Sequence, residues 1–166
     1  MLHVFNDKEG IRIAIEMEKR GESFYRHAAR IAREPQTVKL LGLLADDENV
    51  HRQEFEKLAK TEAIALSCAS YDDETNAFLS AVAAEFIFPK GLMGLRDVGF
   101  EDPASILDKA IESEKNSILF YTKLEQSTQD PHAQHVFAEI IGQESNHLCR
   151  LQQQKQSLDR RSKSQF

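Results

Sequence analysis

Residues that break helices or cross-link a chain are scarce in this sequence. Its 166 residues include two cysteines, seven glycines, four prolines and no tryptophan. Cys68 and Cys149 are too far apart to form a Cys-x-x-Cys metal motif, and two isolated cysteines are typical of reduced thiols in a cytoplasmic protein. With few glycines and prolines to interrupt it, the chain can form long helices.

Long apolar runs and an excess of basic charge are missing as well. No stretch approaches the roughly 20 apolar residues of a membrane-spanning helix, so no membrane partner is expected. The 27 acidic and 21 basic residues give a net charge of −6. The one basic cluster, at residues 160–163, is too short to indicate a nucleic-acid partner. The first seven residues lack the basic-then-apolar layout of a signal peptide, which again favours the cytoplasm.

What the sequence does contain is an internal repeat with a shift of 96 residues. An Ala-Ile-Glu-x-Glu-Lys run, a Phe-Tyr pair and a Glu-x-x-His motif each occur twice, at 14–19 and 110–115, 24–25 and 120–121, and 48–51 and 144–147. Between these motifs, Glu34-Pro35 in the first half corresponds to Asp130-Pro131 in the second. Each half therefore carries a glutamate, a tyrosine seven residues later, a proline turn and a Glu-x-x-His motif.

Apolar residues recur at helical spacing in both halves and predict four long helices. The first extends from about residue 7 to 32 and the second from about 35 to 66. The third begins at Asp102-Pro103, a capping residue followed by a proline at the first helical position. The fourth extends from 131 to about 158.

The connections between these helices predict how they are arranged. A short turn joins the two helices of each half, so they are expected to be antiparallel neighbours. The segment at about 67–102 can travel the length of the bundle, and it includes a short helix predicted at 73–86 with Asp72 as its cap. We therefore predict an all-α four-helix bundle over residues 1–158, formed by a helical-hairpin repeat with one long crossover between helices two and three. Residues 159–166 are predicted to be a frayed polar tail.

Charged residues interrupt the apolar stripe in the middle of all four predicted helices. They are Glu18, Glu48, His51, Glu114, Glu144 and His147. Residues at i and i+3 share a helix face, so each Glu-x-x-His motif presents both side chains inward. Four buried glutamates are costly on their own, whereas two divalent cations neutralise them. Such oxygen and nitrogen ligands suit iron or manganese and also accept zinc.

The paired Glu-to-Tyr runs and the two Glu-x-x-His motifs resemble the ferritin-like diiron carboxylate proteins, and within them the rubrerythrins. The resemblance spans about residues 8–157 and implies a ferritin-like bundle that holds two iron ions. It implies that the metal ligands are Glu18, Glu48, His51, Glu114, Glu144 and His147. It also implies that Tyr25 and Tyr121 donate hydrogen bonds that orient the ligand carboxylates. The alternative is that both tyrosines are ordinary core aromatics.

Two departures from the rubrerythrin pattern matter. Rubrerythrins carry a C-terminal rubredoxin domain whose cysteines bind one iron, and this sequence ends without such cysteines, so a separate electron-donor protein is expected. Rubrerythrins also place an additional glutamate near the third-helix ligand, where this chain has Ser117 and Ile118. Glu22 is either that additional carboxylate or a surface residue. Asp47 precedes Glu48, but helical geometry directs it away from the ligand face, and its repeat partner is Gln143.

Three functions are consistent with these residues. The resemblance favours a homodimeric oxidoreductase that reduces hydrogen peroxide or oxygen. The second is a ferroxidase or iron-handling protein, and the third is a helical bundle with a structural metal and no enzymatic activity. Whether the chain is an enzyme is left open by the sequence.

Overall fold

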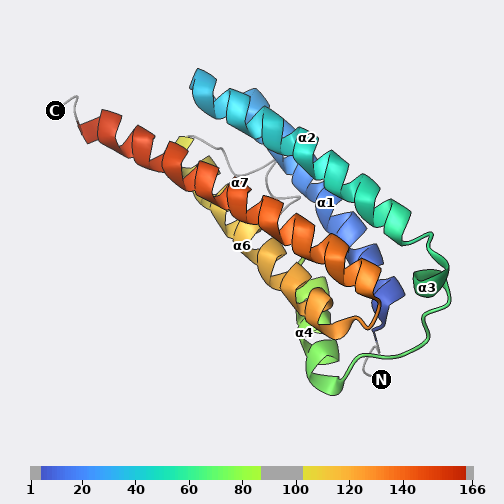
Figure 1. Ribbon diagram of the computed structural model, residues 1–166. Helices are drawn as coiled ribbons and strands as arrows, with labels where there is room; N and C mark the ends of the chain where they lie inside the picture. Colours follow the sequence, from blue (N-terminus) through green and yellow to red (C-terminus); the bar gives the residue numbers. More distant parts are fainter. Residues whose placement is uncertain (1–4, 87–102, 164–166) are drawn as a thin grey trace.

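The structure is a computed structural model that describes residues 5–86 and 103–163, and all regular elements in these ranges are helices. They are α1 (Asp7–Ile31), α2 (Pro35–Leu58), α3 (Glu62–Ala65), α4 (Asp73–Phe86), α6 (Pro103–Ser127) and α7 (Pro131–Lys163). The long helices α1, α2, α6 and α7 lie side by side as a bundle (Figure 1). The prediction of an all-α four-helix bundle is confirmed. No helix in the described ranges is long and apolar enough to cross a membrane.

The bundle consists of two helical hairpins, α1–α2 and α6–α7, that follow the 96-residue repeat. Helices α1 and α6 each have 25 residues, and both their first and their last residues are 96 positions apart. Helices α2 and α7 both begin at a proline that follows an acidic cap. The Glu34 side chain accepts a hydrogen bond from the Thr37 amide at 2.6 Å, and Asp130 accepts one from the Ala133 amide at 2.7 Å. The repeated acidic-residue-and-proline pair is therefore a helix start in both halves.

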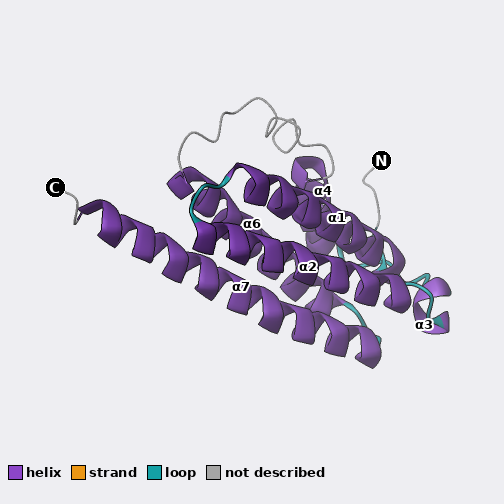
Figure 2. Cartoon of the chain, turned by 90° about the horizontal axis from the view of Figure 1, so that it is seen from above, coloured by secondary structure: helices purple, strands orange, loops and turns teal. Residues whose placement is uncertain are grey.

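Helix α2 ends at one end of the bundle, and α6 begins at the opposite end, so these two helices run in the same direction (Figures 1 and 2). The connection between them includes α3 and α4. Helix α4 has its predicted bounds, and Asp72 caps it by accepting a hydrogen bond from the Thr75 amide at 2.7 Å. Residues 87–102 lie outside the described ranges, so the path of the crossover stays a prediction.

Two predicted helix ends were wrong. Helix α2 ends at Leu58 and not near residue 66, because the Thr61 amide bonds to the Leu58 carbonyl in a tight turn before the short helix α3. The polar segment predicted to fray from residue 159 continues α7 as helix to Lys163. There the Arg161 guanidinium lies 3.3 Å from the Glu34 carboxylate, which ties this last part of α7 to the start of α2. Arginine and lysine near the C-terminus of a helix also suit its dipole.

Two apolar clusters fill the bundle, one on either side of its middle. The first takes side chains from all four long helices, among them Ile11, Phe55, Leu124 and Phe137. The second also draws on all four, among them Phe24, Leu44, Leu107 and Leu151. Burying each such side chain contributes about 1.5–3 kcal/mol. The helix positions between the clusters, near residues 18, 48, 114 and 144, therefore form a layer across the middle of the bundle.

Candidate metal centre

The six charged residues of the apolar stripes converge in this middle layer. Helix α1 contributes Glu18, α2 contributes Glu48 and His51, α6 contributes Glu114, and α7 contributes Glu144 and His147. All six are buried, with exposed fractions of 6% or less. Burial of so many ionisable groups is rare in a helical bundle unless they pair with one another or with a cation.

The six residues form two overlapping groups. The first consists of Glu18, Glu48, His51 and Glu144, and the second of Glu48, Glu114, Glu144 and His147. Within each group, one candidate ligand atom per residue lies within 4.8 Å of the others. Glu48 and Glu144 belong to both groups, so the two groups, each of which could hold a metal ion, have two carboxylates in common.

Both histidines direct the same nitrogen into the site. His51 Nδ1 lies 3.2 Å from Glu144 Oε1 and 3.6 Å from Glu18 Oε2. His147 Nδ1 lies 3.0 Å from Glu144 Oε2 and 3.8 Å from Glu114 Oε2. The two rings are stacked with centroids 5.5 Å apart. Each Glu-x-x-His motif thus presents a carboxylate and an Nδ1 atom to a common space, as expected for i, i+3 residues.

Several inward-facing atoms of this cluster are buried without a hydrogen-bond partner. They are Glu18 Oε2, His51 Nδ1, Glu114 Oε2 and Glu144 Oε1. Although His51 Nδ1 is near Glu144 Oε1, the two atoms are not aligned for a hydrogen bond. Leaving such atoms unpaired costs about 1–3 kcal/mol each, and more when they are charged. These atoms belong to four of the six residues. They are carboxylate oxygens and an imidazole nitrogen, which are atoms that metal cations bind, so the set of residues fits two bound ions.

The electrostatics of the cluster are those of crowded acids. Burial, reinforced by the charges of neighbouring glutamates, raises the pKa of Glu48 well above its usual value. Burial also raises the pKa of Glu114 to about 8. Burial alone would lower the pKa of His147, but the nearby carboxylates of Glu114 and Glu144 raise it to about 9. Without cations the cluster therefore keeps protons that ligands must release when metal binds.

The two tyrosines cross from one hairpin to the other. Tyr25 on α1 donates a hydrogen bond to Glu114 Oε1 on α6, and Tyr121 on α6 donates one to Glu18 Oε1 on α1. Burial raises the pKa of both phenols well above the usual value, so they stay protonated donors. Each carboxylate is held through Oε1, which leaves its Oε2 unpaired and facing the site. This is the geometry expected of side chains that orient ligands.

Sequence reasoning missed the residues that hold the outer nitrogens of the histidines. His147 Nε2 lies 3.1 Å from Asp47 Oδ2, and His51 Nε2 lies 2.9 Å from Gln143 Oε1. Asp47 does point away from the ligand face of its own helix, but it contacts a histidine of the opposite hairpin. The available signal was that Asp47 and Gln143 each precede the glutamate of a Glu-x-x-His motif and are 96 positions apart.

Glu22 and its neighbour Gly21 have different places relative to the site. Glu22 belongs to neither group. Its carboxylate is 2.8 Å from the Arg26 guanidinium in a partly exposed ion pair, which agrees with the alternative that Glu22 is a surface residue. Gly21 lies against the site itself, since a Cβ atom built there would be 3.0 Å from Glu48 Cδ. Only glycine therefore leaves the Glu48 carboxylate where it is.

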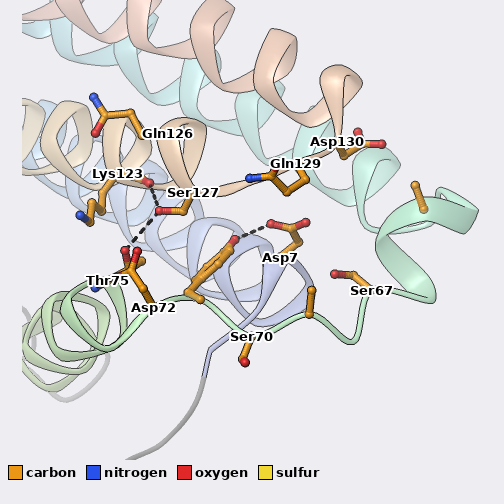
Figure 3. Close-up of a pocket in the computed structure, with 13 residues that line it drawn as sticks. Asp7, Ser67, Ser70, Asp72, Thr75, Lys123, Gln126, Ser127, Gln129 and Asp130 are labelled. Atoms are coloured by element: carbon orange, nitrogen blue, oxygen red, sulfur yellow. Dashed lines mark hydrogen bonds between the residues drawn. The ribbon is translucent and has the colours of Figure 1, made fainter.

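A separate cavity of about 570 Å³ lies at the end of the bundle near α3 (Figure 3). Its lining includes Asp7 of α1, Asp72 and Thr75 at the start of α4, and Lys123 and Ser127 of α6. None of the six clustered residues lines it. The cavity is thus distinct from the candidate metal centre.

Fold and site together define an all-α bundle with a buried cluster of glutamates and histidines that can bind metal. The rubrerythrin family model matches residues 9–155, which is most of the sequence. The chain belongs to the rubrerythrin family.

Solved structures agree with this assignment. The fold is similar to that of a Thermotoga maritima protein that has been proposed to be a ferritin-like diiron-carboxylate protein, with a TM-score of 0.73 and 27% identity over 93% of this chain and 97% of that one. A hypothetical protein from Pyrococcus furiosus shares the fold, with a TM-score of 0.64 and 18% identity over 92% of this chain and 89% of that one. No curated protein sequence gave a match. The prediction of a ferritin-like fold is confirmed.

Proposed function

We propose that the chain is a non-haem diiron carboxylate protein that reduces hydrogen peroxide or oxygen. The observation that carries the proposal is the pair of four-residue groups that share Glu48 and Glu144. One ion would be held by Glu18, Glu48, His51 and Glu144, and the other by Glu48, Glu114, Glu144 and His147. Four carboxylates balance the charge of two divalent cations. Membership of the rubrerythrin family supports iron as the metal.

The chain's own residues suit this chemistry. Bound as a ferrous pair, iron supplies the two electrons that, with two protons, reduce hydrogen peroxide to two waters; zinc cannot, because it does not change oxidation state. Tyr25 and Tyr121 hold the carboxylates of Glu114 and Glu18 in place during the change of charge. The apolar clusters on both sides of the layer keep bulk water away from it. The proposal includes a cytoplasmic homodimer and a separate electron-donor protein.

Anaerobic iron loading tests the activity. Wild type with two ferrous ions per chain is expected to form a diferric absorbance on addition of peroxide, at least an order of magnitude faster than ferrous ions in buffer. The Glu112→Gln variant is the matched control, since Glu112 is exposed and lies outside both groups. Oxidation no faster than that of free iron would exclude the activity.

The same experiment with oxygen in place of peroxide, together with the mass of the protein in solution, separates the alternatives. Faster oxidation by oxygen than by peroxide, together with a large shell-like assembly in solution, would assign ferroxidase and iron storage. Tight metal binding with no redox response would assign a structural metal and no enzymatic activity.

A further inference from the structure

The two halves of the metal centre differ in the side chain that contacts the outer nitrogen, Nε2, of each histidine. Asp47 on α2 presents a carboxylate to His147 Nε2 at 3.1 Å, whereas Gln143 on α7 presents an amide to His51 Nε2 at 2.9 Å. In other respects the groups correspond, because each has one histidine and three glutamates and each histidine directs Nδ1 inward. The repeat is therefore broken at one chemically important position.

A carboxylate and an amide constrain an imidazole differently. The Asp47 carboxylate can only accept, so it requires a hydrogen on His147 Nε2 and leaves Nδ1 as the nitrogen that binds metal. An amide can accept through its oxygen or, after rotation, donate through its nitrogen. Gln143 therefore satisfies either tautomer of His51, including the one whose Nδ1 carries a hydrogen and cannot bind metal. A carboxylate partner also makes a histidine a stronger ligand.

We propose that Asp47 makes the metal position at His147 the tighter of the two, so that the first divalent ion binds there and the second binds at His51. This inference rests on the proposed dimetal function and adds an order of filling. Loss of an outer partner typically lowers metal affinity about 10–100-fold. Because the Asp47 side chain is 44% exposed, we expect a difference near the lower end of that range.

Zinc is a suitable probe because it binds the same donors without redox chemistry. The metal-free full chain is crystallised with one equivalent of zinc, and anomalous differences at the zinc edge give the occupancy beside each histidine. Competition with a chelator gives the two dissociation constants in solution. The variants are Asp47→Asn, Gln143→Glu and, as the matched control, Asp46→Asn, because Asp46 is exposed and contacts Arg26 at 3.2 Å.

In the wild type we expect most zinc beside His147. Asp47→Asn is expected to weaken the first binding step by about tenfold and to equalise the occupancies. Gln143→Glu is expected to tighten the second step, and it tests the inference even if Asp47→Asn lowers stability. Asp46→Asn should match the wild type.

The possible failures are distinguishable. Absence of zinc from both positions would overturn the proposed dimetal function. Two bound ions with equal occupancies in the wild type, zinc first beside His51, or identical binding by Asp47→Asn and Asp46→Asn would overturn the order of filling and leave the dimetal site in place.

Discussion

Replacement of Glu144 by glutamine is expected to abolish binding of both metal ions, whereas His51→Gln is expected to abolish binding of one. Glu144 belongs to both groups, with Oε1 3.2 Å from His51 Nδ1 and Oε2 3.0 Å from His147 Nδ1. His51 belongs to the first group alone. Glutamine keeps the size of the side chain and removes its charge. Since loss of an outer partner costs about 10–100-fold in affinity, loss of a shared ligand should cost more than about 100-fold.

The measurement is the number of metal ions per chain after equilibrium dialysis against micromolar ferrous iron under anaerobic conditions. The expected stoichiometries are two for wild type, one for His51→Gln and none for Glu144→Gln. Glu112→Gln is again the control and should bind two ions. A Glu144→Gln chain that still holds two ions would show that the cluster is not the metal centre.

Removal of metal is expected to lower the melting temperature, and to lower it more at pH 9 than at pH 6. In the metal-free folded chain, burial raises the pKa of Glu114 to about 8, and neighbouring carboxylates raise that of His147 to about 9 against the effect of burial. The usual values are 4.5 for a glutamate and 6.5 for a histidine. Between about pH 4.5 and pH 9 the folded chain therefore holds more protons than the unfolded chain. Its free energy of unfolding falls as the pH rises through this range.

Metal ions replace these protons, so the loaded chain is not expected to share this loss. We expect the difference in melting temperature between the loaded and the chelator-treated chain to widen by at least about 5 °C from pH 6 to pH 9, because 1 kcal/mol corresponds to about 2–4 °C in a chain of this size. Scanning calorimetry provides the measurement. Chelator should have no effect on Glu144→Gln, and a difference that stays constant with pH would contradict the prediction.

The sequence predicted the residues of the cluster because their signal is local. Each charged residue stands in the apolar stripe of its own helix, and helical periodicity alone places it inward, as it does for Glu18 and Glu114. The contacts of Asp47 and Gln143 could not be predicted in this way. They join α2 to α7, and the periodicity of one helix does not say what the neighbouring helix presents to it.

The wrong helix ends have a similar cause. Ala65 and Leu66 follow Leu58 by seven and eight residues, spacings that continue the apolar stripe of α2, so periodicity extends past the turn that ends the helix at Leu58. At the other end of the chain, polar composition predicts fraying. Arginine, lysine and glutamine are good helix formers, however, and the contact of Arg161 with Glu34 depends on packing between hairpins that composition does not report.

The central claim is that six residues of two repeated hairpins hold two metal ions in the middle of the bundle. Anomalous diffraction at the iron edge, from crystals of the full chain grown anaerobically with ferrous iron, tests it most directly. We predict two peaks between α1, α2, α6 and α7, one beside His51 Nδ1 and one beside His147 Nδ1, with Glu48 and Glu144 in contact with both. No peak in this layer, or iron only elsewhere, such as in the cavity lined by Asp7 and Asp72, would contradict the claim.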